Sequence, residues 1–328
     1  MADAEAFKFE VNWYDQQADI TRQYQLTVMQ PMQGPLEATM FDIKSKRIFL
    51  KRMPIMDLRI EDLYVGSTVT INSRQLKVQA YSDPHTKNTF EARRDSVVVL
   101  TSQNSFQQLG QIIDSIEQLG LTISRLRLVN DNGPVVAMQV IGRDAELRFQ
   151  QEVVNSFTPG AVRQVSPVDG NAFFEDRHKY PGTASGDHCT LCVIRPHALK
   201  AGNAGAIITS IMEAGFEISA AATLQLERAQ AVELFEVYQN VVPYFSDLIA
   251  SMTEAPCLAL ELRKELDVVE DFRRLCGTTY DVDMARHLRP GSLRARFGVD
   301  NARNGVHATD LEEDAEREVR YVFEILGN

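Results

Sequence analysis

The 328-residue sequence lacks any apolar run long enough to span a bilayer, and no basic-then-apolar leader follows Met1. Because a membrane span needs roughly 20 consecutive apolar residues, we expect neither membrane insertion nor secretion, and we expect the chain in the cytoplasm. Cysteine is scarce for this length. The four residues, Cys189, Cys192, Cys257 and Cys276, fit reduced intracellular thiols better than a disulfide framework.

Basic residues are in the minority, with 34 Lys and Arg against 45 Asp and Glu and a formal net charge of −11. Because neutralising phosphates needs clustered Lys and Arg, this balance argues against nucleic acid as a general partner. No Gly-x-x-x-x-Gly-Lys sequence occurs, so any nucleotide must be held by arginine side chains rather than by a Walker loop. Apolar residues, in contrast, make up 44% of the chain, enough for a core in each of two or three domains.

One cysteine pair has a spacing that resembles a metal site. His188-Cys189 precedes Cys192, but no second Cys or His pair stands at zinc-finger spacing from it. The alternation of Cys189, Leu191 and Val193 is typical of a strand. We therefore predict a strand here and no metal site.

Residues 7 to 90 have the pattern of a β-rich module. Phe7, Phe9 and Val11 alternate with polar neighbours, and turn signals stand at Gln33-Gly34-Pro35 and Val65-Gly66-Ser67. The same alternation recurs at Tyr24, Leu26 and Val28 and at Val69 and Ile71. No catalytic constellation accompanies these strands, which predict a small sheet or barrel.

More distinctive residues follow one another through this module: Trp13-Tyr14-Asp15, Phe49-Leu50-Lys51-Arg52, Asp62-Leu63, Ser73-Arg74, and Tyr81 with Asp83 and Thr86. Each has an ordinary structural interpretation by itself, since Trp13 suits a core and Lys51-Arg52 a solvated edge. In this order, however, the set resembles the DM-ten module of axonemal proteins. Residues 1–93 are therefore predicted to form such a module.

From residue 95 onward the sequence repeats itself. Gly110 and Gly120 recur as Gly205 and Gly215 at one offset of 95, each pair flanked by an apolar run, a helical isoleucine stripe and a second alternating run. Each copy therefore predicts strand, helix and strand, and a third apolar strand follows in both. The gap before that third strand spans 10 positions in the first copy and 37 in the second, where the extra residues predict helices over roughly 228–239 and 243–252.

A histidine near the end of the chain stands in Asn304-Gly305-Val306-His307-Ala308-Thr309-Asp310. Neutral imidazole can attack a terminal phosphate if cationic groups hold the phosphates and a carboxylate orients the other ring nitrogen. Arg273 and Arg294 are suitable cations, and Glu318 follows the histidine by eleven residues. Thr309 and Glu312 have capping-box spacing, which predicts a helix directly after this loop. A structural loop histidine remains the alternative at this point.

The order strand, helix, strand, two helices, strand, helix and histidine loop is that of a ferredoxin-like αβ sandwich. Residues 189–326 look like a nucleoside diphosphate kinase domain. In that family the histidine of an Asn-x-x-His-Gly-Ser-Asp motif takes a phosphoryl group from a triphosphate and passes it to a diphosphate. The resemblance implies catalytic roles for His307, Asn304 and Glu318.

The resemblance also implies a nucleoside di- or triphosphate with Mg²⁺ as the ligand. The nucleotide-binding residues that it assigns are Arg195, Phe245, Arg273, Thr279, Arg294 and Asn304. Phe245 is taken from the pair Tyr244-Phe245 as the ring on which the base stacks.

Several residues depart from the family pattern. The usual Lys-Pro-Asp is Arg195-Pro196-His197 here, Phe235 replaces a tyrosine, and Ala308 adds a methyl group beside the histidine. The last two changes can each cost about 1 kcal/mol of transition-state stabilisation, so we expect nucleotide binding to outlast catalysis.

The first copy departs further. Thr101-Ser102 replaces the lysine segment, Gln150 stands opposite Arg273, and no Asn-x-x-His follows. The nearest histidine, His178, lies in the charged stretch 175–180, which we interpret as a linker. We predict no activity for this copy.

The predicted fold class is α+β, with an N-terminal β-rich module followed by two ferredoxin-like αβ sandwich domains, the first truncated. The predicted domains are residues 1–93, a degenerate kinase-like domain over 94–186 and a kinase-like domain over 187–328. The whole chain resembles the axonemal branch of the family. That resemblance implies a structural component of ciliary or flagellar doublet microtubules, bound to tubulin and other axonemal proteins. An active kinase working through a phosphohistidine at His307 is the alternative.

Overall fold

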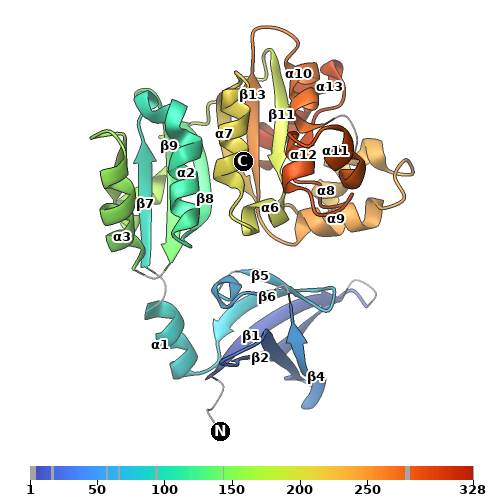
Figure 1. Ribbon diagram of the computed structural model, residues 1–328. Helices are drawn as coiled ribbons and strands as arrows, with labels where there is room; N and C mark the ends of the chain where they lie inside the picture. The colour runs from blue at the N-terminus through green and yellow to red at the C-terminus, as the bar shows by residue number, and fades with distance from the viewer. Residues whose placement is uncertain are drawn as a thin grey trace. The chain divides into compact units, whose positions relative to one another are not determined.

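The computed structural model describes residues 5–15, 18–56, 58–65, 67–92, 95–142, 144–277 and 281–327. The chain divides into two compact units, Met1–Arg94 and Asp95–Asn328. Each unit contains its own sheet (Figure 1). Across the described ranges, no helix combines the length and the apolar content that a membrane span requires.

The first unit is a six-stranded antiparallel sheet with the order β4-β3-β2-β1-β6-β5. Its elements are β1 (Glu5–Asp15), β2 (Ile20–Gln30), β3 (Leu36–Asp42), β4 (Arg47–Ile55), the 3₁₀ turn Ile60–Asp62, β5 (Thr68–Ile71), β6 (Arg74–Tyr81) and α1 (Pro84–Ala92). The predicted β-rich character of this segment agrees with this sheet. Gly66, in the second predicted turn, lies outside the described residues.

The alternating residues of the first unit form its core. Phe7, Phe9 and Val11 on β1 are buried, because the period of a strand places every second side chain on one face of the sheet. Phe90 of α1 packs edge-on against Phe7 and Phe9, with ring centroids 5.1 and 5.2 Å apart. The helix therefore closes one end of this core.

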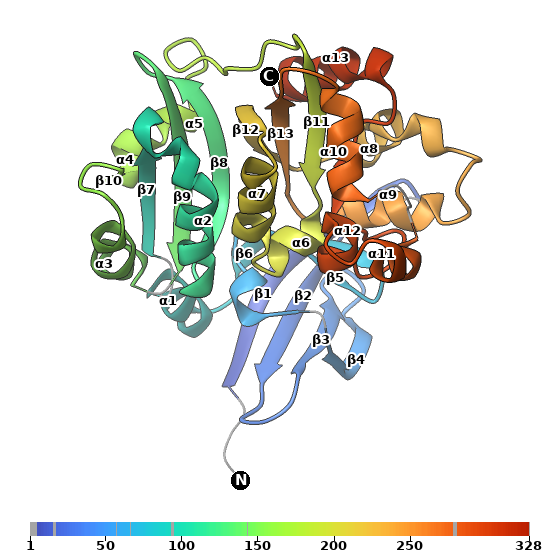
Figure 2. The ribbon, with the colours of Figure 1, turned by 45° about the horizontal axis from the view of Figure 1, so that its top comes forward.

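The second unit holds both repeats in one eight-stranded sheet with the order β10-β7-β9-β8-β12-β13-β11-β14 (Figure 2). The first copy comprises β7 (Asp95–Thr101), η2 (Gln103–Gln108), α2 (Leu109–Gln118), β8 (Thr122–Asn130), β9 (Pro134–Gly142), α3 (Ala145–Arg148), η3 (Phe149–Val153), η4 (Val154–Ser156), β10 (Val162–Val165), α4 (Pro167–Gly170) and α5 (Ala172–Glu175). The second copy begins with β11 (Cys189–Ile194), α6 (Pro196–Lys200), α7 (Ala204–Glu213), β12 (Glu217–Leu224), α8 (Arg228–Leu234), η5 (Glu236–Tyr238), α9 (Phe245–Thr253) and β13 (Cys257–Arg263). It ends with α10 (Val268–Cys276), α11 (Val282–Leu288), α12 (Leu293–Phe297), β14 (Val306–Ala308), α13 (Glu312–Arg320) and η6 (Tyr321–Leu326).

The inserted segment of the second copy is helical, as the sequence predicts. The helix expected over 228–239 is α8 followed by the 3₁₀ turn η5, and the helix expected over 243–252 is α9. In the first copy, β8 and β9 instead follow one another with only residues 131–133 between them. The strand predicted at Cys189 is β11, whose six residues are all buried.

The two copies are joined edge to edge and helix to helix. Strands β8 and β12 lie side by side with Ala222 opposite Arg127, and the amide of Leu126 donates to Oγ1 of Thr223 at 3.0 Å. Helices α2 and α7 pack against each other beside this seam (Figure 2). The sheet is therefore continuous through both copies.

The repeated glycines explain how closely these helices approach. A Cβ atom on Gly110 would lie 2.3 Å from Oγ1 of Thr209, and one on Gly205 would lie 2.2 Å from the backbone nitrogen of Asp114. Neither distance is possible for a side-chain carbon. The glycine pair that reveals the repeat in the sequence is thus the contact point between the copies.

The segment after β10 packs onto the first copy and corrects part of the linker prediction. Residues 175–179 are exposed, in agreement with a linker, but Tyr180 at its end is buried. Its ring stacks on Phe173 of α5 with centroids 4.1 Å apart. These two rings complete a buried cluster with Val98, Leu100, Val129 and Ala137. A charged stretch gave no sign that an aromatic residue at its edge would join a core.

Candidate functional site

His307 lies in the middle of β14, which pairs with β11 so that His307 stands opposite Val193. Its side chain is only 2% exposed. Gly305 precedes the strand with φ of +89°, a conformation that favours glycine, and its carbonyl accepts a hydrogen bond from the amide of Arg195 at 3.0 Å. The loop is thereby fixed to the end of β11.

A carboxylate on α13 orients the imidazole. Nε2 of His307 lies 3.1 Å from Oε2 of Glu318, which also accepts a hydrogen bond from Oγ1 of Thr309 at 2.8 Å. Oγ1 of Thr309 in turn accepts a hydrogen bond from the backbone amide of Leu191 at 3.1 Å. Thr309 and Glu318 are thereby anchored to β11. Because an ionised carboxylate can only accept, Nε2 carries the proton and the lone pair resides on Nδ1. In this tautomer Nδ1 is the ring nitrogen whose lone pair is available to a ligand.

Two aromatic rings stand edge-on to the imidazole. The rings of Phe235 and Tyr238 have centroids 5.1 and 6.4 Å from that of His307. Phe235 offers no hydroxyl, whereas the hydroxyl of Tyr238 donates to Oδ2 of Asp310 at 2.5 Å. Sequence reasoning missed Tyr238. The sequence feature that could have identified Tyr238 is its position three residues after Phe235, about one helical turn further on.

Arg273 is connected to the same group through Asp310. Its Nη1 donates to the carbonyl of Asp310 at 2.8 Å, and its Nη2 lies 3.6 Å from Oδ1 of that residue. Because the Arg273 side chain remains 40% exposed, its guanidinium stays open to solvent beside the site. It is thus suitable for contact with a phosphate.

The other two arginines are more deeply held. Arg195 is 3% exposed, donates to the carbonyl of Ala302, and has its guanidinium carbon 5.9 Å from the centroid of the Phe235 ring. Arg294 is 4% exposed and donates to the carbonyl of Gly277 at 2.5 Å. Both cations are therefore positioned by the main chain.

The remaining predicted site residues differ in what the structure shows. Asn304 is 1% exposed, and its Oδ1 has no hydrogen-bond partner within the described part of the chain. Phe245, at the start of α9, packs against the cluster of α8 and α9, and among the described contacts its ring does not meet His307. Thr279 lies outside the described residues.

His197 stands where the family has a carboxylate. Burial, followed by the nearby charges of Arg195 and Arg303, lowers the pKa of His197 to about 4. The imidazole is therefore neutral at physiological pH and adds no charge to the site. Burial also raises the pKa of Tyr244, which precedes Phe245.

These groups fit a nucleotide. Guanidinium groups match phosphate oxygens, and a buried acceptor without a donor, such as Oδ1 of Asn304, costs about 1–3 kcal/mol that a ligand hydroxyl would offset. Arg195, Phe235, His307 and Glu318 form one chain of contacts, and Tyr238, Asp310 and Arg273 a second. The imidazole is thus oriented by Glu318, and Arg195 and Arg273 are connected to it through Phe235 and through Asp310 and Tyr238.

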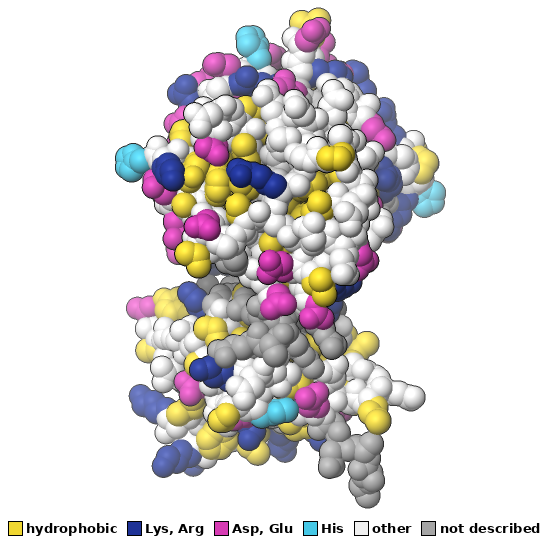
Figure 3. Space-filling model, turned by 90° about the vertical axis from the view of Figure 1, so that its left-hand side faces the viewer, with side chains coloured by type: hydrophobic (Ala, Val, Ile, Leu, Met, Phe, Trp, Pro, Cys, Tyr) yellow, Lys and Arg dark blue, Asp and Glu magenta, His cyan; other side chains and the backbone are white. Residues whose placement is uncertain are grey.

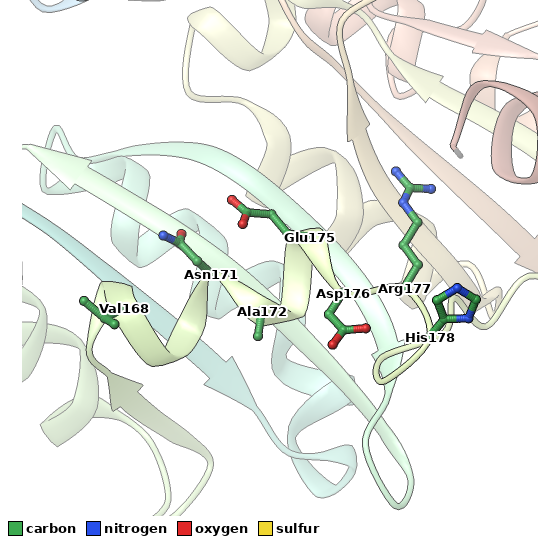
Figure 4. A pocket seen from close by; sticks show the side chains of 7 residues that line it. All are labelled: Val168, Asn171, Ala172, Glu175, Asp176, Arg177 and His178. Carbon is green, nitrogen blue, oxygen red and sulfur yellow. The ribbon is translucent and has the colours of Figure 1, made fainter.

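A depression of about 690 Å³ lies elsewhere, on the first copy. It is lined by Val168, Asn171, Ala172, Glu175, Asp176, Arg177 and His178. The labelled side chains follow one another along a single stretch of chain and do not converge (Figure 4). None of them belongs to the group around His307, so we assign no chemistry to this depression.

Comparisons with known proteins give matches to the second copy and to the whole chain. The family model described as nucleoside diphosphate kinase matches residues 188–326. A nucleoside diphosphate kinase of Pasteurella multocida is 39% identical over 134 residues, which are 41% of this chain and 92% of that protein. Two relatives match nearly the whole chain, namely the nucleoside diphosphate kinase homolog 7 proteins of Rattus norvegicus and Mus musculus. They are 34% and 33% identical over 99% of this chain and 94% of their own lengths. Since such identity extends through both units, the chain belongs to the nucleoside diphosphate kinase homolog 7 family.

Proposed function

We propose that the chain serves mainly as a structural component of the ciliary or flagellar axoneme. In this proposal tubulin and neighbouring axonemal proteins hold it on doublet microtubules as a microtubule inner protein. The observation that carries the proposal is the asymmetry of the two joined copies. The second copy holds the group around His307, whereas the first has Thr101-Ser102 and Gln150 at the corresponding positions.

The packing of the first copy supports this proposal. Phe173 and Tyr180 cover a face of its sheet, where the second copy has α8 and α9. A face filled by the chain's own aromatic rings has no space for a nucleotide. The first copy and the unit Met1–Arg94 are therefore free of catalytic constraint, and their surfaces are the ones we expect to contact tubulin and its neighbours.

Salt extraction of isolated axonemes tests this placement. At roughly 0.5 M salt the Debye length falls to a few ångströms, which releases proteins held by exposed charges alone. A chain inside the doublet wall should stay with the doublets, and a His307→Ala variant should stay equally well. Full release of the chain while the doublets remain intact would rule the placement out.

Phosphoryl transfer is the second candidate function, and the 3.1 Å contact between His307 and Glu318 favours it. Nδ1 would attack the terminal phosphorus of a nucleoside triphosphate, forming a P–N bond as the bond to the β-phosphate oxygen breaks and the diphosphate leaves. A terminal oxygen of a second diphosphate would then take the phosphoryl group from Nδ1. Mg²⁺ on the phosphates would offset their charge, and Arg273 and Arg294 would contact their oxygens.

We expect this transfer to be slow. Arg195 is engaged with the carbonyl of Ala302, Phe235 supplies no hydroxyl, and His307 is almost fully covered. Each feature reduces what the site can contribute selectively to the transition state. Nucleotide binding depends on fewer of these groups and should persist.

Labelled ATP separates the two candidates. The purified chain should bind nucleotide and acquire a phosphohistidine slowly, and His307→Ala should abolish the label. His287, an exposed histidine on α11, provides the matched control, since His287→Ala should leave labelling unchanged. Turnover equal to that of a housekeeping nucleoside diphosphate kinase, lost in His307→Ala, would overturn the structural role as the main function.

A further inference from the structure

The β3–β4 hairpin of the first unit, residues 36–55, presents an open sheet edge. Within the described part of the chain, β4 pairs with β3 on one side and with no strand on the other (Figure 2). Of its nine residues only Ile55 is buried. The outer main-chain N–H and C=O groups of an edge strand are a ready template for another strand.

The opposite end of the sheet touches β4 without covering this edge. Nδ2 of Asn72 contacts Sδ of Met53 at 3.2 Å, and the guanidinium of Arg74 lies 5.2 Å from the centroid of the Phe49 ring. These are side-chain contacts from Asn72 in the turn between β5 and β6 and from Arg74 at the start of β6. They steady β4 and leave its backbone edge open.

Hydrophobic side chains gather on the hairpin although it is exposed. Phe41 and Ile48 stand opposite each other across the two strands and are 39% and 68% exposed. Ile43 is 42% exposed, whereas the ring of Phe49, 40% exposed, packs against the rings of Trp13 and Tyr24. Neighbouring exposed hydrophobic residues on one short hairpin are unusual unless a partner covers them.

The hairpin also has the opposite charge to the chain. Residues 36–55 contain five cations and two carboxylates, in a chain whose net charge is −11. The carboxylate of Asp42 accepts hydrogen bonds from the backbone amides of Lys44 and Ser45, both at 2.8 Å, and so stabilises the turn. Arg52 pairs with Glu37.

Four cations of the hairpin remain directed to solvent. Lys44, Lys46, Arg47 and Lys51 are all exposed, and none forms an ion pair with another described residue. The face of the unit Asp95–Asn328 seen in Figure 3 differs, because acidic and basic side chains are interspersed there. The hairpin is therefore a local basic and apolar surface on an acidic protein.

We propose that this hairpin binds an acidic, extended segment of another protein, which adds to the free edge of β4 as a further strand. Main-chain hydrogen bonds to β4 would provide affinity, and alternate apolar side chains of the partner would lie against Ile48, behind which Phe41 stands on β3. Carboxylates would meet Lys46, Arg47 and Lys51, which steers the encounter and excludes basic segments. The proposal depends neither on His307 nor on placement in an axoneme.

Fluorescence anisotropy with the full chain tests the charge requirement. The probe is a labelled ten-residue peptide of alternating Glu and Val, compared with one of alternating Lys and Val. The acidic peptide should bind, the basic one should not, and affinity should fall at least tenfold between roughly 50 and 300 mM salt. Equal binding of both peptides would overturn the proposal.

Two charge-reversed variants locate the site. The double variant Lys46→Glu/Lys51→Glu should lower the affinity for the acidic peptide at least tenfold. Lys8→Glu/Lys77→Glu makes the same change in net charge on exposed lysines of β1 and β6, and it should leave binding within twofold. Circular dichroism checks that both variants fold. An equal loss of affinity in the two variants would show a general charge effect and contradict the assignment to the hairpin.

The same assay tests strand addition and the class of partner. Two acidic peptides, one N-methylated at its odd residues and one at its even residues, keep their charges, but each loses the donors of one strand edge, so at least one of them should bind at least tenfold more weakly. Undiminished binding of both peptides would exclude pairing with β4. A (dT)₁₀ oligonucleotide that binds the hairpin more tightly than the acidic peptide would replace the polypeptide partner with nucleic acid and contradict the proposal.

Discussion

Glu117, in the last turn of α2 in the first copy, accepts a hydrogen bond from the amide of Gly205 at the start of α7 in the second copy, at 2.9 Å. The amide of Ala204 donates to the same carboxylate at 3.1 Å. The first amides of a helix have no partner within it, so Glu117 supplies one from the other copy. Burial nevertheless raises the pKa of Glu117 to about 7, since the two amides offset the desolvation only in part.

This contact predicts a stability that depends on pH. Below pH 4.5 the Glu117 carboxyl is protonated in the folded and the unfolded chain, and between 4.5 and about 7 only the unfolded chain releases its proton. The contribution of Glu117 to the free energy of unfolding should therefore be largest below pH 4.5. It should decline by about 3 kcal/mol at most as the pH rises to 7.

Urea unfolding of the wild type and of Glu117→Gln, followed from pH 4.5 to 8, measures this difference. The gap between the two free energies of unfolding should change over this range and become constant above pH 7. Parallel curves at every pH would contradict a titrating Glu117.

The glycine contact between the copies predicts a steric penalty. Gly205→Ala adds a Cβ atom that would lie 2.2 Å from the backbone nitrogen of Asp114. Because this distance is too short, α2 and α7 must move apart. We expect a loss of about 1–3 kcal/mol in the free energy of unfolding. Gly291→Ala is the matched control, because a Cβ there meets nothing within 4 Å. Equal melting temperatures for the two variants would argue against a tight helix contact.

Glu318→Gln tests how the imidazole is oriented. The amide keeps the size of the side chain but weakens acceptance from Nε2, so phosphohistidine formation should slow by roughly tenfold to a hundredfold. Nucleotide affinity should change little. Glu316→Gln, on the same helix but paired with Arg320 at the surface, should label like the wild type. Labelling of Glu318→Gln at the normal rate would remove Glu318 from the mechanism.

Phe235→Tyr tests whether a missing hydroxyl limits transfer. A hydroxyl near His307 should add about 1 kcal/mol of transition-state stabilisation and so raise single-turnover labelling about fivefold. The label must disappear in Phe235→Tyr/His307→Ala. A rate that does not rise would place the limitation with Arg195 or with the cover over His307.

Much of the fold could be predicted because the sequence repeats. The constant offset between Gly110 and Gly205 identifies two related units, and the apolar runs around them predict the strands that the structure contains. The spacing of His307 and Glu318 predicts a partnership that two adjoining elements, β14 and α13, make geometrically possible. Regular periodicity is what makes such features visible.

Features that join distant segments could not be predicted. The seam at Leu126 and Thr223 depends on one side-chain hydrogen bond between strands of ordinary composition. Tyr180 belongs to a core although its neighbours are charged, and Tyr238 reaches Asp310 across 72 positions of sequence. Single residues that pack at long range leave no periodic signal.

The pairing of β8 with β12 joins the two copies of the second unit in one sheet, although the two copies differ in their functional groups. The interface between the two copies is formed within one polypeptide, so its formation is independent of protein concentration. Only one half carries the group around His307. Any ligand of that group is therefore counted once per chain and has no twin across the seam with which to cooperate.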